Sequence, residues 1–111
     1  MVEAPPFFIL RINRTCFDVS TSTPYKNSGT VKAPVELNLV SMMASSCPTD
    51  KCAFTLVGSV EHFGQESTSG HYTANCRVRD NWWHFDDSTV TPLENNEPTV
   101  HNAVMLMYRR L

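Results

Sequence analysis

Hydrophobic and polar residues alternate with a period of two along residues 71–78 of this chain. One face carries Tyr72, Ala74, Cys76 and Val78, and the other carries His71, Thr73, Asn75 and Arg77. This period is typical of a β-strand with one covered face. The turn-forming pair Asp80-Asn81 follows, and then the aromatic-rich segment 82–85, a composition typical of half-buried strands. The pattern therefore predicts a β-hairpin over residues 71–88.

Strand patterns also occur outside this hairpin, whereas no segment predicts a long helix. Residues 7–13 carry apolar side chains on both faces, which predicts a central and well-covered strand. Residues 53–63 have the longest strand pattern, with one face formed by Phe54, Leu56, Gly58, Val60 and His62 and the other by Val57 and Phe63. We expect a short alternating strand at residues 35–40 and a short arm at residues 90–93. We also expect a polar stretch with one helical turn at residues 94–102 and a final buried strand at residues 103–110.

Three polar connectors separate these elements. Residues 17–32 are rich in Ser, Thr, Pro, Gly and Asn and predict a long surface loop, of the kind that is usually functional or disordered. Residues 42–51 form a second connector. Residues 64–70 form a polar loop with a glycine at each end, which leads directly to His71. Such a loop is either a hinged element or an ordinary hairpin connection.

The composition is that of one small globular domain, with 111 residues of which 41% are hydrophobic. A net charge of −2 gives no electrostatic reason to expect nucleic acid or an anionic membrane as a partner. The longest apolar runs are too short to span a bilayer, and no basic-then-apolar leader precedes them. The chain opens directly into a core strand, so we expect it to be part of something longer.

The four cysteines are predicted to be thiols in a reducing compartment, which for this chain means the cytoplasm or the nucleus. They are Cys16, Cys47, Cys52 and Cys76. Four residues stand between Cys47 and Cys52, but no second ligand pair accompanies them at a suitable spacing. A structural zinc site needs four grouped ligands, so we expect no metal and no cofactor.

The register of the hairpin decides whether His71 meets a carboxylate. A four-residue loop at 78–81 pairs Arg77 with Trp82 and makes His71 and Asp86 diagonal neighbours, roughly 7–8 Å apart between Cα atoms. A two-residue loop at 80–81 keeps them on one face but one step further apart. Either loop places Asp87 on the opposite face, so Asp86 is the expected partner. A histidine held by a carboxylate is a candidate general base, and a surface histidine near an acidic turn is the alternative.

Five ordered segments together make this chain similar to a known family. They are residues 6–13, the pattern Lys26, Val31, Pro34 and Leu37, residues 54–63, the pair of motifs Gly70-His71-Tyr72-Thr73-Ala74 and Trp82-x-x-Phe85-Asp86-Asp87-Ser88-x-Val90, and residues 103–108. The set resembles the C-terminal, histidine-box part of the catalytic domain of ubiquitin-specific proteases, the cysteine-type deubiquitinases. The resemblance covers nearly the whole chain, from residue 6 to residue 108.

The resemblance implies an α+β, papain-like cysteine protease fold, of which residues 1–111 form mainly the antiparallel β lobe. His71 would be the general base, Asp86 its orienting acid and Asp87 a supporting polar residue in cleavage after the C-terminal glycine of ubiquitin. Two loops, at 64–69 and 17–32, would cover the ubiquitin tail. The residues implied to contact that tail are Gly64, Gln65, Ser69, Gly70 and Tyr72.

The departures from the family pattern concern the nucleophile. The family's Gly-Asn-Thr-Cys segment, its oxyanion-hole Asn and its zinc-binding fingers have no counterpart in this sequence. Arg11-Ile12-Asn13-Arg14 stands where Leu-Lys-Arg-Phe is usual. Cys76 lies five residues from His71, an odd separation that directs it to the other face. We therefore expect no deubiquitinase activity from this chain alone.

Four interpretations stay open from the sequence. The first is the His/Asp half of a deubiquitinase, with ubiquitin or a ubiquitinated protein as its partner. The second is an inactive relative that only binds ubiquitin. The third is a half-site completed in trans by a separate chain that carries the cysteine, the missing N-terminal lobe. The fourth is a solitary β domain with an adaptor role.

Overall fold

The structure, a computed structural model, describes residues 5–42, 51–66 and 69–111. Its strands are β1 (Phe7–Arg11), β2 (Thr15–Asp18), β3 (Thr23–Lys26), β4 (Glu36–Asn38), β5 (Ala53–Phe63), β6 (His71–Val78), β7 (Asn81–Asp86), β8 (Thr89–Pro92) and β9 (Ala103–Arg110). Short 3-10 turns accompany them, among them η1 (Val40–Met42) and η3 (Glu94–Asn96). No α-helix occurs in these described ranges.

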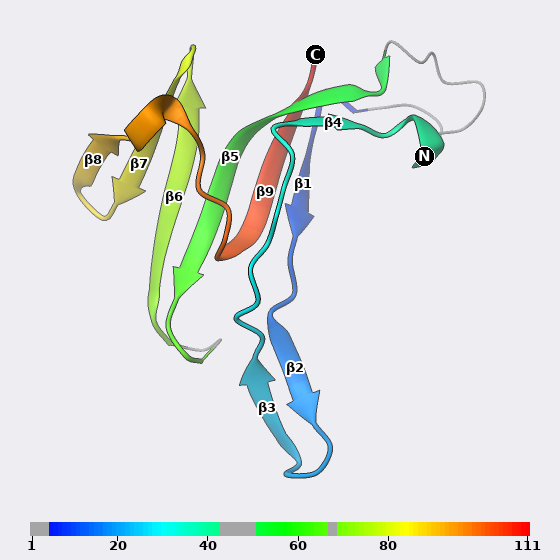
Figure 1. Cartoon of the computed structure of the whole chain (residues 1–111), viewed down its shortest axis with the longest axis vertical. Helices are drawn as coiled ribbons and strands as arrows, with labels where there is room; N and C mark the ends of the chain where they lie inside the picture. Colours follow the sequence, from blue (N-terminus) through cyan, green and yellow to red (C-terminus); the bar gives the residue numbers. More distant parts are fainter. Residues whose placement is uncertain (1–4, 43–50, 67–68) are drawn as a thin grey trace.

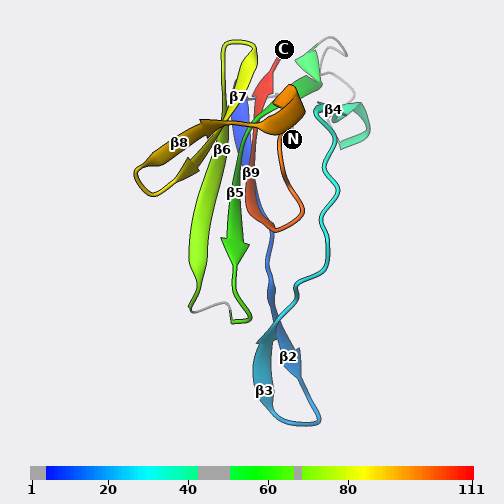
Figure 2. The same cartoon turned by 60° about the vertical axis from the view of Figure 1, so that its left-hand side comes forward.

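An antiparallel sheet forms the body of the molecule, with the strand order β1-β9-β5-β6-β7-β8 (Figure 1). The long strand β5 pairs with β9 along one edge, and with β4 and then β6 along the other. β2 and β3 form a separate hairpin that projects beyond the end of the sheet in both views (Figures 1 and 2). Because most of the chain folds into antiparallel strands, a period of two in hydrophobic and polar residues predicts most of its elements.

The hydrophobic core lies on one face of this sheet, here called the covered face. Its fully buried members are Phe54, Leu56, Trp82, Ala103, Leu106 and Tyr108. Segments 33–39 and 93–100 pack side chains onto it, and the Tyr108 hydroxyl donates a hydrogen bond to the carbonyl of Pro34 at 2.8 Å. Phe8 also packs there, with its ring centroid 4.7 Å from that of Phe54. The chain therefore covers one face of its sheet with its own loops.

The opposite face, here called the open face, carries apolar residues that remain exposed. Ile9, Met105 and Met107 are 59%, 42% and 42% exposed. They line an apolar depression of about 230 Å³ together with residues of β5 and β6. The prediction that residues 7–13 form a central, covered strand is wrong. β1 is the edge strand next to β9, and its outer edge pairs with no strand in the described chain.

The strand predicted at residues 53–63 is confirmed with its bounds, but its face assignment fails at a bulge. The pairing with β9 shifts between Leu56 and Gly58, and again between Val60 and Glu61. An extra residue in one strand reverses the in-and-out alternation beyond it. Ser59 and Glu61 consequently continue the covered face after Leu56, where the sequence pattern had placed Gly58 and Val60.

The predicted loop at residues 17–32 overlaps the β2–β3 hairpin, which spans residues 15–26, so that prediction is wrong in part. Polar and proline residues do form strands when cross-strand bonds and turn chemistry support them, here with Asp18 bonded to Ser20 in the turn. The short strand, the arm, the single helical turn and the final strand are confirmed as β4, β8, η3 and β9, although β9 buries only alternate residues. Residues 43–50 of the second connector lie outside the described residues.

Candidate functional site

His71 is the first residue of β6 and Asp86 the last residue of β7. Arg77 pairs with Trp82, which confirms the register that makes His71 and Asp86 diagonal neighbours. The chain reverses through Arg79 and Asp80, one residue earlier than the predicted turn pair, and Arg79 takes a positive φ of 59°. Turn and register together bring the two side chains to one face.

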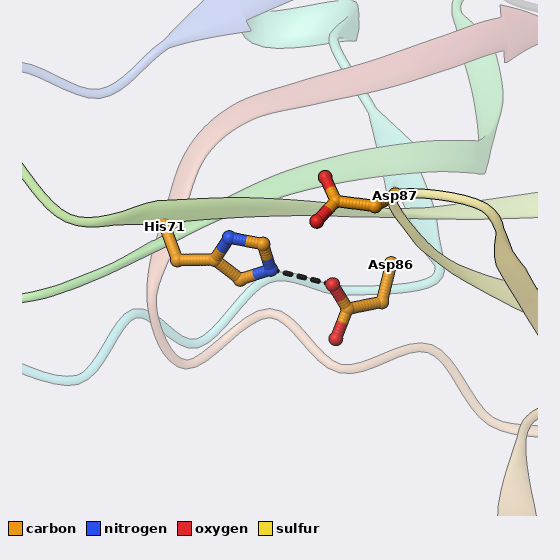
Figure 3. Close-up of side chains that lie close together, drawn as sticks. All are labelled: His71, Asp86 and Asp87. Atoms are coloured by element: carbon orange, nitrogen blue, oxygen red, sulfur yellow. Dashed lines mark hydrogen bonds and ion pairs between the residues drawn. The ribbon is translucent and has the colours of Figure 1, made fainter.

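The imidazole of His71 and the carboxylate of Asp86 form a hydrogen bond of 2.5 Å between Nε2 and Oδ1 (Figure 3). Both side chains remain roughly half exposed, at 47% and 45%. The hydrogen bond and the charge of Asp86 raise the pKa of His71 above its ordinary 6.5, and the charge of Asp87 adds to this. Because Asp86 occupies Nε2, Nδ1 is the ring nitrogen available for a second partner.

Asp87 lies beside this pair, contrary to the expectation that it faces the other way. Its carboxylate and the ligand atoms of His71 and Asp86 all lie within 4.8 Å of one another (Figure 3). The period-two rule fails here because β7 ends at Asp86 and Asp87 has a positive φ of 50° in the turn to β8. These three residues are of types that bind metals. However, Nε2 of His71 and Oδ1 of Asp86 are already hydrogen-bonded to each other.

The glycine before His71 has a specific steric reason. Gly70 has φ +125°, and a Cβ at this position would overlap the carbonyl oxygen of Phe63 and lie 2.8 Å from Nε2 of His62. Gly64 at the other end of the loop has φ +144°. Of the residues implied to contact the ubiquitin tail, Gly64, Gln65, Ser69 and Gly70 belong to this exposed loop. Residues 67–68 lie outside the described residues.

A pocket of about 270 Å³ lies on the side of β6 that carries Tyr72. Its lining includes His62, whose ring centroid is 4.7 Å from that of Tyr72 and whose buried Nε2 has no hydrogen-bond partner. Lys26 also lines it and donates to the carbonyls of His62 and Gly64, at 3.1 and 2.8 Å. Burial and the nearby charge of Arg14 lower the pKa of Lys26. The pocket is therefore bounded by basic and aromatic groups at the foot of the 64–70 loop.

Sequence reasoning missed the role of Arg14, which is 8% exposed and links segments 27–29 and 101–103 to the chain just after β1. Its guanidinium donates to the carbonyls of Ala103 and His101 at 3.1 Å each, to that of Asn27 at 3.2 Å, and to that of Gly29. Five planar donors on one side chain suit such a junction. The available signal was a basic residue directly after an apolar strand.

No cysteine of the described residues belongs to the cluster around His71. Cys76 is exposed on the open face and Cys16 is half-buried in β2, and both are free thiols as predicted. Cys52 is fully buried in the protein interior. Cys47 lies outside the described residues, and with it the Cys47–Cys52 spacing. Within the described residues, no helix has the length and apolar character needed to traverse a membrane.

Comparison with known proteins gives one consistent family. Residues 1–108 match the family described as ubiquitin carboxyl-terminal hydrolase. The chain is 31% identical over 104 residues to ubiquitin carboxyl-terminal hydrolase 24 of Arabidopsis thaliana, covering 93% of this chain and 18% of that protein. It is 39% identical over 59 residues to ubiquitin carboxyl-terminal hydrolase 3 of Mus musculus, covering 53% of this chain and 11% of that protein. The chain thus spans about a fifth or less of these relatives.

Solved structures agree with these sequence matches. The SAGA DUB module with Ubp8, Sgf11, Sus1 and Sgf73 bound to monoubiquitin contains a chain with a TM-score of 0.83 and 25% identity, covering 96% of this chain and 24% of that one. A yeast SAGA DUB module with a mutant Sgf73 gives a TM-score of 0.80 at 26% identity. The described sheet therefore has the fold of one part of a larger deubiquitinase chain.

Proposed function

Because this chain belongs to the ubiquitin carboxyl-terminal hydrolase family, we propose that it forms the His/Asp half of a papain-like, thiol-dependent deubiquitinase. The reaction is hydrolysis of the bond after the C-terminal glycine of ubiquitin. His71 is the general base, Asp86 orients it and Asp87 supports it. The observation that carries this proposal is the hydrogen bond between Nε2 of His71 and Oδ1 of Asp86.

The geometry suits a cysteine nucleophile. With Nε2 bonded to Asp86, Nδ1 accepts the thiol proton, and the carboxylate favours the imidazolium that results. The thiolate attacks the carbonyl carbon of the scissile bond, and the imidazolium returns its proton to the departing amine. Water then attacks the thioester, gives its proton to His71 and releases the carboxylate of ubiquitin and the thiol.

The nucleophile in this proposal comes from a segment other than residues 1–111, in the same polypeptide or in a separate chain. The described cysteines support this, because none of them joins the cluster of His71, Asp86 and Asp87. The matched relatives are also about four or more times as long as this chain. In this proposal residues 1–111 are the C-terminal part of a catalytic domain that works in the cytoplasm or the nucleus.

The tail of ubiquitin is proposed to approach along the 64–70 loop and Tyr72. Gly64, Gln65, Ser69 and Gly70 belong to this exposed loop, and the missing side chain at Gly70 lets the loop close against the Phe63 carbonyl and the His62 ring. His62, whose buried Nε2 lies next to Gly70, lines the pocket below the loop together with Tyr72 and Lys26. These basic and aromatic groups support a peptide-binding role for the pocket.

A chimera tests the catalytic proposal. Residues 1–111 replace the aligned segment of the Arabidopsis hydrolase 24, and hydrolysis of a fluorogenic ubiquitin substrate is measured. We expect the chimera to be active, His71→Ala to abolish that activity, and the 111-residue chain alone to be inactive. Activity of the isolated chain that His71→Ala abolishes would reveal a nucleophile within it. A folded chimera that binds ubiquitin but is inactive would contradict the catalytic role.

The two aspartates provide a sharper test in the same chimera. Asp86→Ala should lower kcat by about 10² or more, in the range by which positioned general bases contribute, with KM nearly unchanged. Asp87→Ala should cost less, because Asp87 acts on His71 only through its charge. A larger loss for Asp87→Ala would contradict the assignment of Asp86 as the orienting acid.

A ubiquitin-binding module without catalysis is the second candidate, and the pocket lined by Tyr72, His62 and Lys26 favours it. Binding needs no nucleophile. Titrating labelled chain with ubiquitin should shift resonances of the 64–70 loop and Tyr72, whereas ubiquitin that lacks its two C-terminal glycines should not. A ubiquitin probe with a C-terminal electrophile, which labels only a nucleophile, separates this candidate from the enzyme.

A further inference from the structure

A buried polar network occupies the covered face of β5, β6 and β7 next to the His71–Asp86 pair. Its central side chains, Ser59, Glu61 and Asn75, are 3%, 2% and 2% exposed. Thr99, in the segment that covers this face, joins them. Catalysis as proposed above uses none of these groups directly, although burying polar atoms is costly unless each finds a partner.

Glu61 is a buried carboxylate that neutral donors satisfy. Its Oε1 accepts from Nδ2 of Asn75 at 3.1 Å and from the hydroxyl of Thr99 at 2.6 Å, and its Oε2 accepts from the backbone N–H of Asn102 at 3.2 Å. Hydrogen bonds to a charged acceptor are stronger than bonds between neutral groups. The carboxylate therefore fixes the orientation of the Asn75 amide.

The orientation of Asn75 in turn fixes His84. Nδ2 of Asn75 faces only acceptors, namely Glu61, the Ser59 hydroxyl and Thr99. Its Oδ1 therefore faces β7, where Nδ1 of His84 lies 2.8 Å away. An amide oxygen only accepts, so Nδ1 of His84 carries the proton and donates. A single chain of donors and acceptors thus runs from the carboxylate in β5 to the ring in β7.

This chain ends two residues before Asp86. Asn75 and His84 are direct cross-strand partners, and Trp82 beyond them is held in the core at 5% exposure. Toward the other end of β7, the side chains become partly exposed up to Asp86. Among the described residues, the partly buried bond between His84 and Asn75 is therefore the side-chain hydrogen bond between β6 and β7 that lies nearest to the exposed pair. A two-residue slip, the smallest that keeps every face, would move Asp86 by about 7 Å along the strand.

We propose that His84, held by Asn75, Glu61 and Thr99, is a positioning residue that keeps Asp86 within hydrogen-bond distance of His71. This inference deepens the proposed function, because it concerns the same pair, but the bond it explains exists whether or not the chain is catalytic. His84 acts through β7 and touches neither the reacting atoms nor the imidazole of His71.

The test measures the pKa of His71 in the 111-residue chain by following its ring resonances with pH in NMR. His84→Phe keeps a ring but removes the N–H donor, and His84→Asn keeps an N–H at the position of Nδ1. We expect the pKa of His71 to fall toward its ordinary value in His84→Phe and to stay raised in His84→Asn. Thermal unfolding is measured in parallel, since lost stability alone does not move the pKa of an exposed histidine.

A matched pair of threonine variants provides the second arm. Thr99→Val removes the hydroxyl that donates to Glu61, whereas Thr91→Val makes the same change on β8, opposite His84 and outside the network. We expect Thr99→Val to lower the pKa of His71 and Thr91→Val to leave it unchanged. If His84→Phe does not fold, the pKa of His71 in the two threonine variants tests the proposal. If Thr99→Val does not fold either, the network serves only to pack the core, and the proposal is overturned.

An unchanged pKa of His71 in folded His84→Phe and Thr99→Val would also overturn it. Both arms need no nucleophile, no ubiquitin and no turnover. An inactive chimera, together with a lowered pKa of His71 in His84→Phe and Thr99→Val, would therefore reject the catalytic role and support the positioning role. An active chimera, together with an unchanged pKa of His71 in these variants, would support the catalytic role and reject the positioning role.

Discussion

Along β6, the two faces of the sheet bury the opposite of what their residue types suggest. On β6, the polar residues Thr73 and Asn75 are 6% and 2% exposed, whereas Tyr72 and Val78 on the other side are 56% and 51% exposed. The covered face lies under the chain's own 93–102 segment, and the open face has no covering segment in the described chain. Burial therefore depends on which loops return over a face, and hydrophobicity alone did not reveal this.

The comparison also separates two ways of using a surface. On the covered face, buried side chains form specific hydrogen bonds that orient their neighbours near His71. The open face presents aliphatic and thioether groups without directional partners. Contiguous exposed apolar patches of this kind are association sites in soluble proteins.

The largest expected effect distinguishes neighbouring residues of β9. Leu106→Ala removes a side chain that is 4% exposed and should lower the free energy of unfolding by about 2–5 kcal/mol, the usual cost of such a cavity. Met107→Ala, at 42% exposure on the open face, should cost less than about 1 kcal/mol. Chemical denaturation of both variants measures the two values, and equal costs would mean that the open face is buried in solution.

A second effect concerns the open face itself. We expect the isolated chain to bind a hydrophobic dye and to associate as its concentration rises, because exposed apolar area favours contact with other apolar surfaces. Met107→Lys should reduce both dye fluorescence and association, which sedimentation measures, while Arg109→Lys serves as a control on the same strand. A sharp, concentration-independent melt without dye binding would favour an independent binding module over part of a larger catalytic domain.

The smallest effect belongs to the exposed end of the covered face. Asp86→Asn removes the charge that raises the pKa of His71, so NMR titration should show a lower pKa in this variant. The contact stabilises the folded chain below the ordinary pKa of 6.5 and loses this contribution as the pH rises through the raised value. The Asp86→Asn variant should therefore lose stability, relative to the parent chain, mainly at acidic pH. An unchanged pKa would show that the pair does not form in solution.

The hairpin shows which parts of the site the sequence could predict. The hydrogen bond between His71 and Asp86 was predictable, because it follows from strand parity and an even-residue loop. The position of Asp87 was not, because a left-handed φ in a turn reverses the parity that holds within a strand. The network of Glu61, Asn75 and His84 was equally hidden, since the bulge at Val57 sets which side of β5 carries Glu61.

Short-range residue patterns were enough to predict the local periodicity, the strands at residues 53–63 and 103–110 and the family of the chain. These properties depend on neighbours within a few residues, where pleating and turn chemistry dominate. Only the tertiary structure decided that β1 is an edge strand, that polar side chains fill the covered face and that Arg14 ties four carbonyls together. Those outcomes depend on contacts between residues as far as 89 positions apart, which no local pattern encodes.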